Sequence, residues 1–301
     1  MEWAGSVSVF SGRNGVLLYR LSGFEEFGQF GGAIAAVGDV NSNGFDDFVV
    51  MGGMVPDARG RAVVYDGFNG RVIYAIQGTQ RSGMLGMTLA GIGDINGDNV
   101  PDFALGAPYE SPIDPLLGNL DFERWLSGRV HVHSGKTGEL LYVINGEYRT
   151  GFLGTVLAGV GDVNGDGVPD IAAGNSDSWG VEGLQRGFVR IFSGTDGSLI
   201  RLLAGGEKNY AFGWSVTGLG DLNGDGRAEF AIGDPYFEVF DNVSVGRVEV
   251  FSGSNFSVLK SVDGLLNSRF GLALAGSDVN NDGLLDLVVG ADEGGGNPTG
   301  P

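Results

Sequence analysis

The chain has 301 residues, of which 42% are hydrophobic and 18% are charged, and its formal net charge at pH 7 is −19. This composition predicts a folded protein, and the acidic balance disfavours nucleic acid and anionic membrane surfaces as partners. The sequence has no cysteine, which excludes disulfides and thiol chemistry, and no apolar run of membrane-spanning length.

In chain order, the sequence begins with a pair of strands and then repeats one unit of four short strands. In each unit a glycine-rich apolar strand leads into an acidic loop and a second apolar strand. A variable loop, an alternating strand, a tight turn and a fourth strand follow. No segment has a helical period with caps. The expected segments are the strand pair 5–23, the units 27–78, 83–146, 151–205 and 210–264, and the strand pair 269–292.

The spacing of the acidic loops indicates a repeat architecture. Successive copies start 55, 68, 59 and 57 residues apart. A period of this length is typical of propellers and solenoids, and four-stranded sheets bury both faces when they pack around an axis. We therefore expect one all-β domain over 1–301, a β-propeller of four-stranded antiparallel blades. The fifth blade is split between 269–292 and 5–23; the alternative is a fragment of a larger ring.

Each acidic loop has oxygen-bearing side chains at positions 1, 3, 5 and 9, and a backbone carbonyl is available at position 7. Because Ca²⁺ takes six to eight oxygen ligands and the loops contain no histidine, this pattern predicts up to five calcium sites. The expected ligands are Asp39, Asn41, Asn43, Phe45 and Asp47; Asp94, Asn96, Asp98, Val100 and Asp102; Asp162, Asn164, Asp166, Val168 and Asp170; Asp221, Asn223, Asp225, Arg227 and Glu229; Asp278, Asn280, Asp282, Leu284 and Asp286.

An EF-hand or a plain turn accounts less well for these loops. An EF-hand needs flanking helices and a glutamate at position 12, where these loops have Val, Leu, Ala, Ile and Val. A plain Asp-Asn-Gly turn does not require an acid at both position 1 and position 9 in five copies. The ligand positions hold 14 of the 37 acidic residues, and without a cation their carboxylates would repel one another.

Two short motifs accompany the acidic loops: "FG" stands at Phe212-Gly213 and Phe270-Gly271, "GAP" at Gly106–Pro108, and the calcium-type loop precedes the GAP-like segment in each copy. This order of motifs resembles the FG-GAP repeats of the integrin α-subunit β-propeller and its bacterial relatives. The resemblance implies a propeller with Ca²⁺ between strands one and two, and a role in adhesion or extracellular binding. Such propellers usually have seven blades, so a fragment of a seven-bladed ring stays open as the alternative to five.

We expect a partner to bind the face opposite the calcium loops, where the long loops between strands two and three emerge. Aromatic side chains there and basic residues near the FG positions are the candidates, although each can instead pack locally or be solvated. The candidates for the ligand face are Arg81, Tyr109, Trp125, Arg149, Trp179, Lys208, Tyr236 and Phe237.

The functional prediction is a calcium-binding adhesion or protein-binding module outside the cell, and not an enzyme. The alternatives are a lectin-like carbohydrate-binding propeller and a polysaccharide-processing enzyme. No catalytic residues are assigned, because His131 and His133 lack a third partner and no nucleophile or phosphate motif is present. The start of the chain has no signal peptide, so we expect a mature or truncated form of an exported protein. Loops that bind calcium weakly fill at the millimolar calcium found outside cells.

Overall fold

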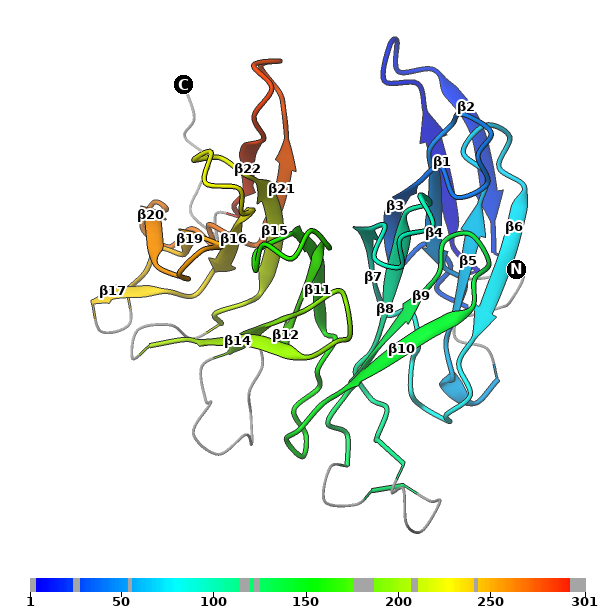
Figure 1. Ribbon diagram of the computed structural model, residues 1–301, viewed down its shortest axis with the longest axis horizontal. Helices are drawn as coiled ribbons and strands as arrows, with labels where there is room; N and C mark the ends of the chain where they lie inside the picture. The colour runs from blue at the N-terminus through cyan, green and yellow to red at the C-terminus, as the bar shows by residue number, and fades with distance from the viewer. Residues whose placement is uncertain are drawn as a thin grey trace. The chain divides into compact units, whose positions relative to one another are not determined.

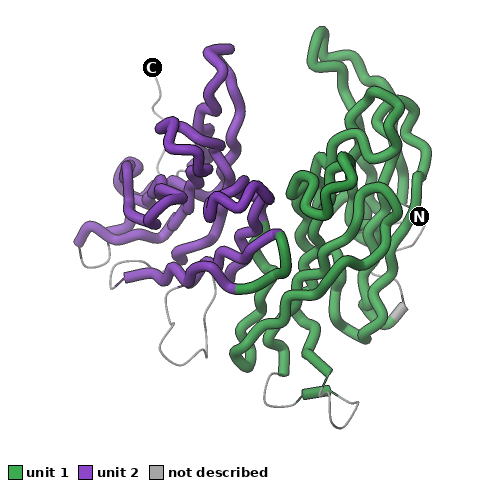
Figure 2. The backbone as a smooth tube through the Cα atoms, in the orientation of Figure 1, with its two compact units in different colours: residues 1–157, 195–198 green, residues 158–194, 199–301 purple. Residues whose placement is uncertain are grey.

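The computed structural model describes residues 4–23, 28–53, 56–113, 120–121, 125–175, 187–206, 211–240 and 243–292. Apart from the short 3-10 turn η1 (Pro56–Ala58), the regular structure in these ranges is β-strand. No helix there is long and apolar enough to cross a membrane. The chain divides into unit 1, residues 1–157 and 195–198, and unit 2, residues 158–194 and 199–301 (Figure 2).

Unit 1 contains a strand pair and two four-stranded antiparallel sheets, in which neighbours in sequence are neighbours in the sheet (Figure 1). The strand pair consists of β1 (Ser6–Phe10) and β2 (Leu17–Ser22). The first sheet consists of β3 (Ile34–Gly38), β4 (Asp47–Met51), β5 (Arg61–Tyr65) and β6 (Val72–Gln77). The second sheet consists of β7 (Thr88–Gly93), β8 (Asp102–Ala107), β9 (Arg129–His133) and β10 (Leu140–Asn145).

Unit 2 repeats this plan with two sheets and two strand pairs; the first two residues of its first strand fall in unit 1. One sheet consists of β11 (Val156–Gly161), β12 (Asp170–Asn175), β13 (Phe188–Phe192) and β14 (Leu199–Ala204). The other consists of β15 (Ser215–Gly220), β16 (Glu229–Asp234), β19 (Arg247–Phe251) and β20 (Val258–Asp263). The strand pairs are β17 (Glu238–Phe240) with β18 (Val243–Ser244), and β21 (Ala273–Ser277) with β22 (Asp286–Gly290).

The expected repeat of four-stranded antiparallel blades is confirmed, because every complete unit of the sequence forms one sheet in the order of its strands. The two expected terminal strand pairs are also present, as β1–β2 and β21–β22. The small hairpin β17–β18 was not expected, since it lies inside a loop that we assigned no structure. That the terminal pairs share a blade and that five blades close a ring remain predictions.

The middle strands of each blade form the core. In the first blade β4 and β5 are buried on both faces, which explains why their sequences are continuously apolar and not alternating. Val49 and Val64 pack with Phe103 and Leu105 of the next blade in one hydrophobic cluster. A second cluster in unit 2 joins β13 and β16 in the same way. The contact of one sheet face with the next is the packing that a propeller requires.

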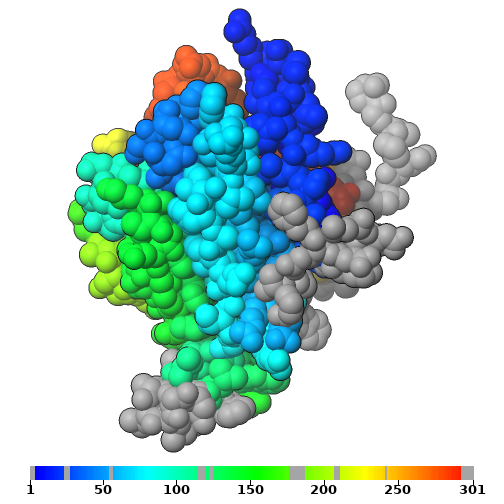
Figure 3. All heavy atoms as spheres, turned by 90° about the vertical axis from the view of Figure 1, so that its right-hand side faces the viewer, coloured from blue at the N-terminus to red at the C-terminus, as the bar shows by residue number. Residues whose placement is uncertain are grey.

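The FG-like signal marks the junction between one blade and the next. Gly60, just before β5, forms a parallel bridge with Leu85, which precedes the glycine at the start of the next blade. A Cβ at Gly60 would lie 2.2 Å from the carbonyl oxygen of Leu85, so only glycine fits. Gly5 makes the same bridge with Phe30, which places the hairpin β1–β2 beside the first blade (Figure 3). This hairpin therefore occupies the position of strands three and four of a preceding blade.

In unit 1, a tyrosine of β2 and one of β6 each hold the turn between strands three and four of the next blade. The Tyr19 hydroxyl donates to the carbonyl oxygen of Gly67 at 2.7 Å, and the Tyr74 hydroxyl donates to that of Gly135. Burial raises the pKa of Tyr74, so its phenol stays protonated and able to donate. A Cβ at Gly138 would lie 2.8 Å from the Tyr74 ring, which requires glycine in this turn.

Candidate calcium loops

The acidic loops connect the first and second strands of the blades, and the carboxylate at position 1 organises each of them. In the second loop, Asp94 accepts the backbone amides of Gly97 and Asp98 on Oδ1 and that of Asn99 on Oδ2, at 2.8–3.2 Å. Position 6 has a left-handed backbone, with φ of 62° at Asn99 and 84–90° at the glycines of the other four loops. The position 6 amide therefore reaches back to position 1, and the loop closes tightly.

Positions 3 and 5 continue the same pattern of side chain to backbone bonds. Asn96 Oδ1 accepts the amide of Asp98 at 2.9 Å, and Asp98 Oδ1 accepts the amide of Val100 at 2.9 Å. These two bonds recur in the other four loops. The loop folds through successive Asx turns, so its oxygen-bearing side chains turn toward its own interior.

The acid at position 9 is buried in the four complete blades, with an exposure of 0–1%. Asp102 Oδ2 accepts the amide of Ile95 at 3.0 Å, and its Oδ1 accepts that of Gly135, in the turn after strand three, at 2.9 Å. The closing acid thus ties the calcium-type loop to the neighbouring turn of its blade. Burial outweighs the amide donors and raises the pKa of Asp170 to about 6.

The loops differ in how much of their charge is neutralised by the protein. Asp221 accepts the amide of Gly226, which lowers the pKa of this carboxyl and keeps it ionised. In the part of the chain that the structure describes, no lysine or arginine forms an ion pair with Asp94, Asp98 or Asp102. Three carboxylates within nine residues then lack a compensating cation, an arrangement that favours a bound metal ion.

The donor set suits calcium, although the side chains are not gathered around one point. Asn164 Nδ2 lies 3.0 Å from Asp166 Oδ2 and 3.3 Å from Asp170 Oδ1, so positions 3, 5 and 9 are within reach of one another. Over the described ranges, no three histidine or acidic side chains form a cluster close enough to hold a metal. Carboxylate, amide and carbonyl oxygens are the ligands that a hard cation prefers, so the residues fit Ca²⁺.

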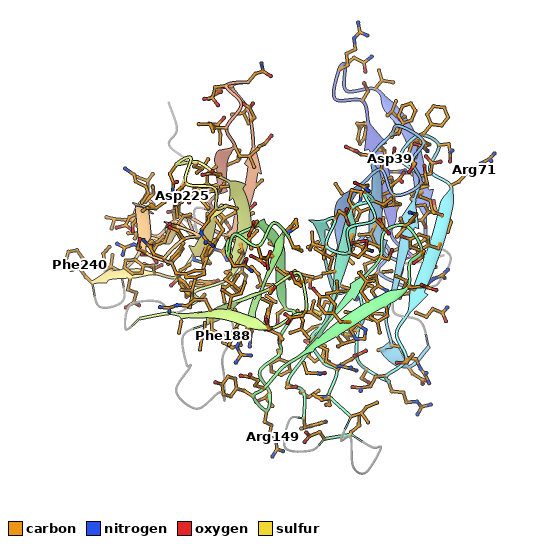
Figure 4. The ribbon with its side chains drawn as sticks, viewed as in Figure 1. Asp39, Arg71, Arg149, Phe188, Asp225 and Phe240 are labelled. Carbon is orange, nitrogen blue, oxygen red and sulfur yellow. The ribbon has the colours of Figure 1, made fainter. Side chains whose placement is uncertain are left out.

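In unit 1, the expected ligand-face residues lie at the opposite end of the strands from the acidic loops, as Arg149 and Asp39 show (Figure 4). Trp125 is 42% exposed, and the Arg149 guanidinium lies 5.8 Å from its ring centroid. Tyr109 packs edge-on against Phe152, and Arg81 forms an exposed ion pair with Asp57. Trp125 and Arg149 are therefore brought together, whereas Tyr109 and Arg81 have other partners.

In unit 2, Tyr236 is exposed and packs edge-on against Trp214, at a centroid distance of 5.9 Å. Phe237 was expected to contact a partner, but it is only 6% exposed and lies 3.6 Å from the Arg247 guanidinium. It offers a partner little surface, because it anchors its loop to strand β19. Trp179 and Lys208 lie outside the described residues. Sequence analysis missed Trp214, which is 40% exposed and follows the FG glycine.

His131 and His133 belong to a structural cluster. His131 Nε2 lies 2.8 Å from Glu110 Oε2, which also accepts a bond from Arg129 at 3.2 Å. Glu110 is buried at the base of the long loop after β8, as Phe237 is after β16. In both blades the residue at this position contacts the arginine that begins strand three, Arg129 in β9 and Arg247 in β19.

The fold and the loops together define a class: a repeat protein of antiparallel four-stranded blades, each with an Asx-turn loop of oxygen donors. Comparison with known proteins gives the particular type. The family model for the FG-GAP repeat matches residues 212–251 and 270–301. The chain therefore carries FG-GAP repeats, and it is integrin-α-like by the similarities that follow.

Three relatives illustrate the similarity. Integrin alpha-E of Homo sapiens is 31% identical over 172 residues, integrin alpha-PS2 of Drosophila melanogaster 30% over 221, and integrin alpha-V of Gallus gallus 29% over 223. These matches cover 52%, 66% and 69% of this chain, but only 14%, 14% and 20% of the relatives. The chain thus corresponds to a small part of a whole integrin α subunit.

Proposed function

We propose that this chain is a calcium-stabilised, integrin-α-like module that binds a protein partner outside the cell. The observation that carries the proposal is the set of five acidic loops with the same Asx-turn pattern, each placed between strands one and two. The similarity to integrin α subunits supports an adhesive or protein-binding role, and the rigid blades support long loops suited to recognition.

Calcium would be held by the position 1, 3, 5 and 9 side chains and the position 7 carbonyl, and it would neutralise the loop carboxylates. Each loop would then be stabilised by mass action, by about 1.4 kcal/mol when free calcium is tenfold above its Kd. Five ions would bring the formal net charge from −19 to −9, because each adds two positive charges. Weak loops of this kind fill at extracellular calcium, which supports an extracellular location.

Thermal unfolding with and without a chelator, followed by calcium titration, tests this proposal. Asp94→Ala with Asp98→Ala should lower the Tm more in calcium than in EDTA, where only the bonds to the loop amides are lost, and one site should be lost from the titration. The control is Asp66→Ala with Asp196→Ala, which removes two charges from the turns after strand three. Its effect on the Tm should be equal in calcium and EDTA. A wild-type Tm that is the same in calcium and in EDTA would refute the proposal.

The exposed pair of Trp125 and Arg149 is the first place to test for a protein partner. An exposed tryptophan beside an arginine provides the residue types that dominate binding energy at interfaces. Replacing both with alanine should weaken capture of a partner protein at least tenfold without changing the Tm. Tyr109→Phe serves as the control, because it preserves the ring contact with Phe152 and removes only a hydroxyl.

A carbohydrate ligand is the second candidate, favoured by the exposed Trp214–Tyr236 pair of unit 2. Two neighbouring aromatic rings of this kind can stack against sugar rings. A glycan array with wild-type protein and Trp214→Ala would identify such a ligand by loss of signal in the variant. An array without any signal would eliminate this candidate.

A further inference from the structure

Arg227 of the fourth loop reaches across to the third loop. Its Nη1 donates to the carbonyl oxygen of Val163 at 3.2 Å. A Cβ on Gly165 would lie 2.8 Å from the Arg227 Cζ and Nη2 atoms and 2.9 Å from Nη1. The guanidinium therefore lies flat against the backbone of the third loop, between its position 2 and its position 4.

This contact adds a positive charge to a loop that is otherwise acidic. Asp162 lies three residues before Gly165, Asp166 follows it directly, and Asp170 closes the same loop. Arginine is unusual at position 7, because the other four loops have Phe45, Val100, Val168 and Leu284 there. Loop 1 is followed in unit 1 by loop 2, which has Val100 at position 7, and loop 4 is followed in unit 2 by loop 5, which has Leu284 there. Neither of these following loops has a positive charge at position 7.

A cation held against the backbone of a loop with three carboxylates has opposite effects in the two states of the loop. Without metal, the guanidinium attracts the carboxylates and relieves their mutual repulsion. With a divalent ion in the loop, the same charge repels the ion and competes with it for the attraction of the carboxylates.

We propose that Arg227 is a resident cation of the third loop, which stabilises this loop without calcium and weakens calcium binding there. The inference rests on the proposed calcium function and concerns the regulation of one of its sites. The third loop is then the last of the three-carboxylate loops to fill as calcium rises, even though its own sequence matches the calcium pattern fully. The affinity of one loop is set by a side chain that the next blade supplies.

Calcium titration by calorimetry on the full chain tests the proposal, with Arg227→Gln compared with Arg227→Lys and Arg71→Gln. Arg227→Gln removes the charge, and one site should bind calcium roughly 3- to 10-fold more tightly. Arg227→Lys keeps the charge, and Arg71→Gln removes one from an exposed turn of the first blade (Figure 4). Both should keep the wild-type affinities. In EDTA, Arg227→Gln should have a lower Tm than either.

The same substitution in a chain whose third loop cannot bind calcium identifies the site affected. In the background Asp162→Asn with Asp166→Asn, Arg227→Gln should leave the remaining affinities unchanged. An effect that persists there belongs to the fourth loop and overturns the proposal, as does an unchanged affinity in the first titration. If no variant binds calcium, the proposed function fails, whereas a lowered Tm of Arg227→Gln in EDTA would still support the neutralising role.

Discussion

His133 occupies a position that is aromatic in the other complete blades, where Tyr65, Phe192 and Phe251 stand. It is buried and stacks on Phe103 at a centroid distance of 5.8 Å. Burial lowers the pKa of this imidazole from 6.5 to about 4. The folded protein therefore holds a neutral histidine where its neighbours hold a neutral ring.

This burial predicts a dependence of stability on pH. Between pH 6.5 and 4 the unfolded chain binds a proton on His133 and the folded chain does not, so stability falls as the pH falls. The loss attributable to His133 is about 2 kcal/mol at pH 5. In His133→Phe, the free energy of unfolding measured with denaturant should fall between pH 7 and pH 5 by about that amount less than in the wild-type protein. Equal losses in both proteins would contradict the prediction.

Asp98 and Asp102 should respond differently to the same substitution. Asp98→Asn keeps an oxygen for the amide of Val100, so it should lower the Tm only in calcium. Asp102 is buried and accepts amides on both oxygens, and in Asp102→Asn an NH₂ group must replace one acceptor. The cost should be about 2 kcal/mol in EDTA as well as in calcium. Denaturant unfolding under both conditions tests this, and an Asp102→Asn effect confined to calcium would refute it.

At the scale of the elements, the tyrosine contact between blades is a separable source of stability. Tyr74→Phe removes the hydroxyl that donates to Gly135 and leaves the ring against Gly138. The expected loss is about 1 kcal/mol, measured by denaturant unfolding. Tyr109→Phe is the control and should change stability by less than about half of that. A neutral Tyr74→Phe would show that water replaces the bond.

The sequence predicted the strands well because burial leaves a direct pattern in them. Middle strands such as β4 are apolar throughout, and glycines mark the turns with left-handed backbones. The hairpin β17–β18 escaped prediction, because it lies in a variable loop and has no counterpart in the repeat. The burial of Phe237 could not be predicted for a different reason: its partner Arg247 is ten residues away, and only the fold brings the two together.

The acidic loops were predictable as loops, because their acids recur at fixed spacing. The different roles of the acids at positions 1 and 9 were not predictable. Nothing in the sequence distinguishes position 9, which is buried and ties the loop to a neighbouring turn, from position 1, which organises the loop backbone. The contact of Arg227 with Val163 joins residues 64 positions apart, in different repeats, and such a pairing has no local signature.

For the whole molecule, the net charge of −19 should make stability depend on salt. In EDTA, sodium chloride screens the repulsion among the loop carboxylates, so the Tm should rise between 0.05 and 0.5 M salt, concentrations at which the Debye length falls from roughly 14 to 4 Å. In saturating calcium the loops are neutralised and the rise should be much smaller. Scanning calorimetry in both conditions makes the comparison, and equal rises would indicate that the loops do not carry the effect.

The strand pairs β1–β2 and β21–β22 are expected to share one blade. In other blades the residue equivalent to Phe10 is buried, as Phe251 is at 5%, whereas Phe10 is 59% exposed. The pairing of Val49 with Val64 in the first blade predicts that Val288 pairs with Val9. In a shared blade, the pair β21–β22 would cover the β1–β2 pair and bury Phe10 as its counterparts are buried in the other blades.

The absence of cysteine makes this prediction simple to test. Val9→Cys with Val288→Cys should form a disulfide within one molecule, seen as faster migration on a non-reducing gel. Val9→Cys with Val289→Cys is the control, because neighbouring residues of a strand point to opposite faces. A disulfide between molecules, or none, would refute the shared blade.

The tyrosine contact also bears on how such a chain can change its number of repeats. In the first blade, the carbonyl oxygen of Gly67 accepts a hydrogen bond from Tyr19 of the preceding strand pair. Tyr74 of the same blade donates a hydrogen bond to the turn of the following blade. A duplicated segment would therefore contain both halves of the contact and would fit against its own copy. Gain or loss of a whole repeat by recombination leaves every junction between blades intact. A substitution of the tyrosine or of the turn at one junction, in contrast, requires a compensating substitution in the neighbouring repeat. The pairing of Arg201 with Phe256 is such a case, in which both sides differ from the tyrosine form.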